Sequence, residues 1–220
     1  MGSGTVTKFR GTKIAAITSY AVGGSITAIS LANPAVVTQT AHGFVDQDVV
    51  LIAGVVGMTE LNGKLFVVDS ATANTYSLVG VSSLDYVAYA SGGTAAKAVM
   101  SNYCNLTSYS ADTGSTSETV TETICSTEVE PDFGLPDPGS VSIGYNLDEA
   151  NAVQIAFENS RRNVSPMAVK ITYPGASGKV MVDIGVVTQT GVSGAAGTPN
   201  WTGTATLRRT RNRVDALVTP

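Results

Sequence analysis

The chain has 220 residues, a formal net charge of −4 and 14% charged side chains, against roughly 25% in an ordinary soluble domain. Plentiful apolar residues and sparse charge exclude disorder as the main state, and the acidic balance argues against a dedicated nucleic-acid binder. We expect no membrane span, because no apolar run approaches the roughly 18 residues that a span needs, and no secretory signal at the start. The low charge content is typical of a surface that partner subunits cover.

Residues 24–97 form a run of short apolar segments separated by turn signals such as Asn33-Pro34 and Asn62-Gly63. Glycine pairs stand at both ends of this run. We interpret residues 24–97 as a small all-β domain inserted into a host domain made of residues 1–23 and 98–220, with its two ends close together. The predicted strands of this segment are Ile26–Ala32, Ala35–Thr40, Val49–Ala53, Lys64–Val68, Thr75–Val79 and Tyr86–Tyr89.

The host segments also alternate with a period of two. Residues 167–173, 179–186 and 201–208 each place apolar side chains at every second position, which predicts three strands. The Gly- and Pro-containing stretch 191–200 is expected to be the loop between the last two. The segment from Asp112 to Thr116 resembles the tip of a long hairpin.

One segment, from about 148 to 162, predicts a helix. Asn146 is a candidate N-cap, Ala150, Val153 and Phe157 form an apolar stripe, and two arginines end the segment. One helix among many strands predicts an all-β fold, an antiparallel β-sandwich or partial barrel with a flanking helix.

The two cysteines, Cys104 and Cys125, are too few for a disulfide framework, and no histidine lies near them to complete a zinc site. We expect two buried, reduced thiols. A bridge between paired strands stays open as an alternative.

Charge is segregated along the chain. Residues 98–160 contain ten acidic residues and no Lys or Arg, whereas residues 161–220 contain eight basic and two acidic residues. Such a chain can pair its charges internally. It can equally dock head to tail on copies of itself, because complementary patches steer association.

No set of residues points to catalysis. His42, the single histidine, has no nucleophile motif beside it, and no phosphate-binding glycine motif is present. We therefore predict that the protein is not an enzyme and has no catalytic, cofactor-binding or metal site. Function is expected to lie in assembly or binding.

Two stretches resemble known families. Thr119-Val-Thr-Glu-Thr-Ile-Cys125, followed by Gly134-Leu-Pro-Asp-Pro-Gly-Ser-Val-Ser142 and then a helix, resembles the major tail tube proteins of long-tailed phages. Asn33-Pro-Ala-Val-Val-Thr-Gln-Thr-Ala-His-Gly-Phe44 and Val56-Gly-Met-Thr-Glu-Leu-Asn-Gly-Lys-Leu-Phe66 are similar to a small β module of phage structural proteins. That module is named after part of the ubiquitin-activating enzyme and carries none of its active site here.

The tail tube resemblance implies a structural virion protein, made in the bacterial host cytoplasm. It implies six-fold rings that stack head to tail into a hollow conduit for genome delivery. The expected partners are further copies of the chain, a tape measure protein in the lumen, and the tail tip and tail terminator proteins. DNA is expected to pass through without specific binding, with no membrane involved. The inserted module is expected on the tube exterior.

Candidate contact residues follow from this resemblance. The acids Glu118, Glu122, Glu128 and Glu130 are expected to face the lumen or a neighbouring subunit. The basic residues expected to take part in ring stacking are Lys8, Arg10, Arg208, Arg209, Arg211 and Arg213.

Two other functions stay open. The chain could be another phage structural protein, such as a tail or capsid decoration or a fibre-associated subunit. It could also be a host-surface binding module, for which the candidate aromatic platform is Phe44, Tyr76, Tyr86 and Tyr89, although core packing is the alternative use of these rings.

Overall fold

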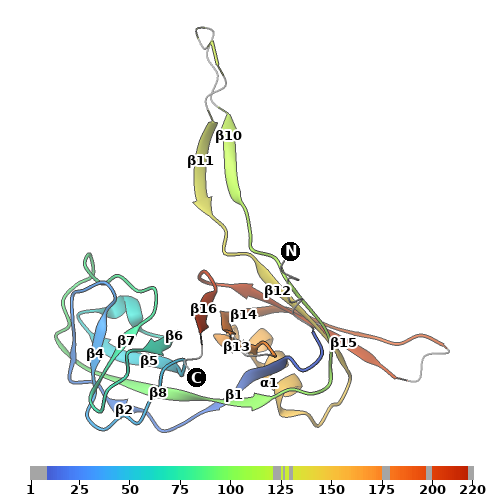
Figure 1. The fold of residues 1–220 in the computed structure, drawn as a ribbon, viewed down its shortest axis with the longest axis horizontal. Helices are drawn as coiled ribbons and strands as arrows, with labels where there is room; N and C mark the ends of the chain where they lie inside the picture. The colour runs from blue at the N-terminus through green and yellow to red at the C-terminus, as the bar shows by residue number, and fades with distance from the viewer. Residues whose placement is uncertain are drawn as a thin grey trace, which may run out of the picture.

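The computed structural model describes residues 9–120, 125, 127–128, 131–174, 179–196 and 200–217. The fold is all-β with one flanking helix, as the sequence predicts, and a hairpin projects from its body (Figure 1). The strands are β1 (Lys13–Tyr20), β2 (Gly24–Ser25), β3 (Ala28–Ile29), β4 (Val36–Thr38), β5 (Val49–Val56), β6 (Lys64–Asp69), β7 (Thr75–Leu78), β8 (Ser91–Asn102), β9 (Leu106–Ala111), β10 (Thr116–Val120), β11 (Pro131–Pro136), β12 (Ser140–Asn146), β13 (Met167–Thr172), β14 (Lys179–Ser193), β15 (Thr202–Arg209) and β16 (Val214–Leu217). The helices are the short 3-10 helix η1 (Thr59–Leu61) and α1 (Ala152–Asn163).

One 14-stranded sheet runs through the molecule in the order β3-β4-β7-β6-β5-β8-β1-β13-β14-β15-β12-β9, with β2 and β16 paired beside this path. Strand β14 is long enough to pair twice. Its first half pairs with β13 and β16, and its second half, from Gly185 to Ser193, pairs with β15. The sheet thereby turns from one layer of a sandwich into the other.

The sandwich core lies between these two layers. Its inner layer is formed by β1, β13 and the first half of β14, and its outer layer by the second half of β14, β15, β12 and β9. Side chains from both layers and from α1 form one buried cluster, which includes Ile14, Val141, Phe157, Ile171 and Leu207. The single helix therefore completes the core and does not form a separate layer.

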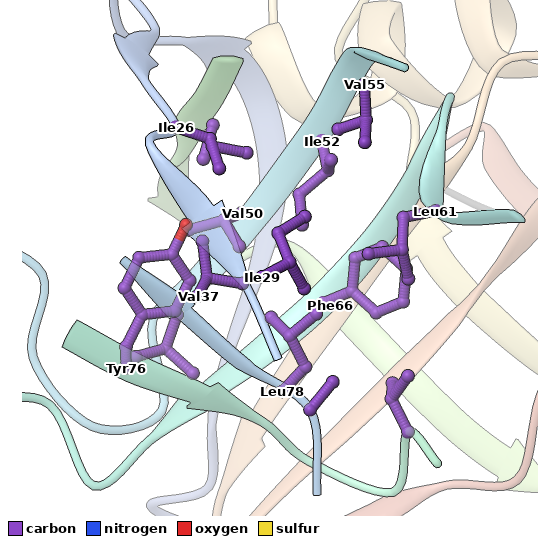
Figure 2. Packing of buried hydrophobic residues seen from close by; sticks show 14 of the residues in the cluster. Ile26, Ile29, Val37, Val50, Ile52, Val55, Leu61, Phe66, Tyr76 and Leu78 are labelled. Atoms are coloured by element: carbon purple, nitrogen blue, oxygen red, sulfur yellow. The ribbon is translucent and has the colours of Figure 1, made fainter. Parts of the chain in front are cut away.

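Residues 24–97, predicted as an insertion and called the inserted unit below, contain a buried cluster of their own. Figure 2 shows its side chains directed into the space between the strands, with Tyr76 toward one side and Phe66 toward the other. The ends of the unit lie side by side, because the backbone N–H of Ala21 donates to the carbonyl of Lys97 at 2.8 Å.

A third buried cluster joins the two parts. Leu65 and Val67 of β6 pack with Ile17 of β1 and with Val182 and Ile184 of β14. The inserted unit is therefore packed on β1 and the first half of β14, on the face of these strands that points away from the sandwich core.

The helix begins later than the sequence predicts. Asn151 is the N-cap, and its side chain accepts a hydrogen bond from the N–H of Val153 at 3.0 Å. Asn146, the predicted cap, ends β12, and its carbonyl accepts from Nε2 of Gln154 at 2.9 Å.

Two strand predictions were also wrong. Residues 86–89 form no strand; the Tyr89 hydroxyl instead donates to the carbonyls of Ile26 and Gly92, which fixes this segment as a loop over the core. Strand β14 continues to Ser193, through the start of the predicted loop 191–200, because its second half pairs with β15.

Candidate assembly arm and hydroxyl face

Strands β10 and β11 form a two-stranded arm that projects away from both parts of the body (Figure 1). Every residue of the two strands is exposed. The register pairs Glu118 with Phe133 and Val120 with Pro131, so these side chains share one face of the arm. Phe133 and Leu135 are 64% and 91% exposed. The arm thus presents an acidic and apolar face with no partner among the described residues of the chain.

The base of the arm is a pair of facing turns. Gly114 N–H donates to Oδ1 of Asp112 at 2.9 Å, and Gly139 N–H donates to Oδ1 of Asp137 at 2.8 Å. Both glycines have positive φ, of +77° and +79°, and a Cβ on either would collide with the carbonyl oxygen of the opposite aspartate. The predicted hairpin tip at 112–116 was wrong, because the segment is this bend. Residues 121–124, 126, 129 and 130 lie outside the described residues.

A buried ionic cluster holds the base of the arm. Nη1 of Arg209 donates to the carbonyls of Asp112 and Pro138, one on each side of the arm. Nε of Arg209 donates to Oδ1 of Asp183 at 2.6 Å. Arg213 donates to the same oxygen at 3.0 Å, and the Tyr109 hydroxyl donates to Oδ2 at 2.8 Å. The hydrogen bonds of Arg209 therefore connect the arm base to the buried Asp183 and fix the orientation of the arm.

The same contacts affect the ionisation of Tyr109. Burial, together with the neighbouring Asp183 carboxylate, raises the pKa of the Tyr109 phenol well above its ordinary value. The phenol consequently stays protonated and remains a hydrogen-bond donor to Asp183 across the physiological range.

The outer face of the outer layer is lined with small neutral side chains. The register places hydroxyl-bearing residues of four adjacent strands on this face, and glycines lie between them. The hydroxyl-bearing residues are Ser108, Ser110, Ser140, Ser142, Ser193, Thr202, Thr204 and Thr206, and the amide of Gln189 and the apolar side chain of Val186 share the face. In these strands the register adds one charged side chain, Arg208, at one end of the face, where it pairs with Asp137 at 2.7 Å.

The layer that carries this face has two strand edges without a strand partner in the described part of the chain. One is β9, at which the strand order ends. The other is β14 beyond Gly185, where pairing with β13 stops and only β15 continues. At Val187 the N–H is occupied by Oγ of Ser160, at 3.2 Å, so the free edge begins after that residue.

The predicted basic cluster is dispersed by strand alternation. Arg208 points outward to Asp137, whereas Arg209 points inward and has a side chain only 1% exposed. The guanidinium of Arg211 lies 4.5 Å from the ring centroid of Phe66, and burial there lowers the Arg211 pKa. Arg213 joins Asp183. Only Arg208 of these four is more than half exposed along its side chain, so only Arg208 is readily available to a neighbouring subunit.

The remaining predicted contact residues lie at the surface or outside the described residues. Glu118 and Glu128 are exposed, and Arg10 is exposed near the N-terminal end of the described chain. Glu122, Glu130 and Lys8 lie outside the described residues. A role for these residues in contacts between subunits stays a prediction.

The rings of the candidate aromatic platform pack in or against the core of the inserted unit. Tyr76 and Phe44 are buried in the core of the inserted unit, and Tyr86 and Tyr89 pack against it, so the packing alternative holds for these rings.

Cys104 and Cys125 are free thiols, but both are exposed, which corrects the prediction that they are buried.

The described part of the chain contains no helix long and apolar enough to cross a membrane.

Residues 32–98 match the family model of the ubiquitin-activating enzyme E1 FCCH domain. The match coincides with the inserted unit and covers less than half of the chain. No curated protein matches the sequence.

Among solved structures, one chain of the "anti-feeding prophage (AFP) baseplate, 6-fold symmetrised" is similar, with 13% identity. The likeness covers 56% of this chain and 87% of that chain, at a TM-score of 0.41. Similarity of this extent does not establish a shared fold or function.

Sequence reasoning missed the hydroxyl face, although its signal was present. The alternation of Thr202, Thr204 and Thr206 with apolar residues predicts a strand, but one strand alone does not reveal what its neighbours place beside these hydroxyls. Arg209 was missed as an anchor for a similar reason, because its partner Asp183 lies on another strand.

Proposed function

We propose that this chain is a structural subunit of a phage tail, and specifically a tail tube subunit. Copies join side by side into a six-fold ring, and the rings stack around a hollow conduit for the genome. The observation that carries the proposal is the outer layer of the sandwich, which combines two free strand edges with a nearly uncharged hydroxyl face.

The strand count of this layer supports a ring. Its four strands, from β14 through β15 and β12 to β9, are each antiparallel to the next. Because the number is even, β9 runs antiparallel to β14. Copies related by rotation therefore bring β9 of one against β14 of the next in antiparallel orientation, and one kind of pairing continues around the ring. Such joining also covers both edges, which otherwise invite uncontrolled pairing.

The hydroxyl face supports a conduit for DNA. Lys or Arg on a channel wall would bind phosphates and hold the duplex, whereas small Ser and Thr side chains neither bind strongly nor obstruct. A ring of six such layers has more strands than the roughly 16–18-stranded porins, whose barrels already enclose an aqueous channel. The helix and the inner layer cover the opposite face of these strands, so the hydroxyl face is the one available to a lumen.

Electron microscopy of the purified full chain, with variants of the β14 edge, tests the proposal. Consecutive N–H groups of a strand point to opposite neighbours, so of Gly191→Pro and Val192→Pro one removes an N–H directed at β15 and the other an N–H directed at the free side. We expect hollow rings or tubes from the wild type. The variant that lacks the N–H directed at the free side is expected to keep wild-type thermal stability and to form no rings or tubes. Solid or open aggregates, or rings that survive both substitutions, would contradict the tube.

A further inference from the structure

A groove with basic walls lies where the inserted unit meets the host sheet. It has a volume of about 440 Å³ and is lined by Lys13, Lys97 and Lys170, with Asp48 as its one acidic residue. The lining also includes the apolar residues Ala15, Val49 and Met100. The groove is thus both apolar and positively charged, in a chain with a net negative charge.

The charges of the groove are only partly satisfied within the chain. Lys97 forms an ion pair with Asp48 at 2.6 Å, and Nζ of Lys170 donates to the carbonyl of Gln47 at 3.4 Å. Lys13 makes no ion pair with any described residue. Burial lowers the pKa of Lys170, and the positive charge of Lys97 adds to that effect while Asp48 opposes it. An acidic partner would relieve this excess of positive charge.

The arm has the complementary character. One face of the arm combines Glu118 with the exposed side chains of Val120 and Phe133, and the opposite face carries Asp132. No Lys or Arg occurs between residues 98 and 160. A two-stranded hairpin on its own is marginally stable in water, so an arm of this kind gains order when it docks.

We propose that the arm of one copy docks, by its acidic and apolar face, in the lysine groove of a second copy. Within one copy the arm projects away from the inserted unit and from β1, so it does not reach its own groove (Figure 1). The contact is heterologous, because arm and groove are different surfaces, and each copy therefore keeps a free groove or a free arm for a further copy. This inference rests on the self-assembly proposed above and names the surfaces that carry it.

A charge exchange tests the docking. One variant reverses the charge of the docking face of the arm with Glu118→Lys. The other reverses the groove with Lys13→Glu and Lys97→Glu, together with Asp48→Asn to avoid repulsion within the chain. Self-association is measured by analytical ultracentrifugation over a range of salt concentrations, and circular dichroism melting verifies that each variant is folded.

We expect each variant alone to self-associate about tenfold more weakly or worse, and an equimolar mixture of the two to recover association. The mixture recovers because each reversed surface meets an opposite one on the other variant. Glu149→Lys and Lys64→Glu, which change charge outside arm and groove, are the matched controls and should behave as wild type. Wild-type association is expected to fall as salt rises.

Three results would overturn the docking: unchanged association of the folded variants, a mixture that does not recover, or a wild-type chain that stays monomeric at low salt and high concentration. The outcomes separate this inference from the tube. Hollow rings that form regardless of the reversals contradict the docking alone, whereas charge-dependent association into solid, non-hollow assemblies contradicts the tube alone.

Discussion

Arg209 and Asp183 form an ion pair inside the sandwich, with 2.6 Å between Nε and Oδ1 and side-chain exposures of 1% and 0%. The same arginine donates to a backbone carbonyl on each side of the arm base. One buried residue therefore links the core of the subunit to its projecting arm.

Asp183→Asn is expected to destabilise the fold by about 3–5 kcal/mol, because it leaves the Arg209 and Arg213 guanidinium groups buried without a counter-charge. Urea unfolding measures the change. Arg208→Met, which removes the more exposed ion pair to Asp137 from the neighbouring strand β15, is the control and should change stability little. Equal effects of the two substitutions would show that burial does not govern this cluster.

Gly114→Ala is expected to disrupt the arm base, because its Cβ would meet the Asp137 carbonyl in a backbone conformation that Ala rarely adopts. Gly63→Ala is the matched control, since Gly63 also has a positive φ, of +71°, but open space around its Cβ position. We expect a larger loss of thermal stability, and faster proteolysis within the arm, for Gly114→Ala. If both variants behave alike, the contact between the two turns does not matter.

Glu158 predicts an acid-dependent contribution to stability. Hydrogen bonds from Arg161, Arg162 and Thr190 hold the pKa of Glu158 well below its ordinary value. Because the pKa is lower in the folded state, this contribution is present at neutral pH and is lost as the pH falls from the ordinary glutamate value toward the folded one. The stability difference between wild type and Glu158→Gln, measured by urea unfolding at several pH values, should therefore shrink in acid. A difference that is independent of pH would contradict the assignment.

Thr204→Lys tests the hydroxyl face, on the assumption that rings form. Thr204 is exposed at the middle of the face, so the monomer fold should be unaffected. Assembled Thr204→Lys rings should retain duplex DNA in a salt-dependent manner, whereas wild-type rings and Thr204→Gln rings should not. Fluorescence anisotropy with labelled DNA measures retention. An amine reagent too large to enter the lumen should not modify assembled Thr204→Lys rings. Modification at position 204 would show that this face lies on the outside of the ring.

Replacing residues 24–97 with a short Gly/Ser linker is expected to yield a chain that aggregates. The deletion uncovers Ile17, Val182 and Ile184, which pack against Leu65 and Val67 of the inserted unit. Polar substitutions at Ile17 and Val182 should restore solubility to the shortened chain, as measured by light scattering. A shortened chain that is soluble without them would show that the third cluster is dispensable.

The sequence by itself determined the local structure and the class of fold. Period-two alternation predicted strands at 167–173, 179–186 and 201–208, which the structure contains as β13, the first half of β14 and β15, because side-chain alternation depends on near neighbours in the chain. It also showed an acidic central segment, although not where its acids lie in space.

Only the tertiary structure decided which side chains share a face of the sheet and which come into contact. Adjacent arginines 208 and 209 point to opposite sides of β15, so one lies at the surface and the other holds the arm from within. The hydroxyl face and the lysine groove are each assembled from strands that are distant in sequence, because pairing partners are chosen by register and packing across the whole chain. The prediction of a hairpin tip at Gly114 was wrong for the same reason, since the opposing turn at Gly139 becomes its neighbour only after β9 and β12 have paired.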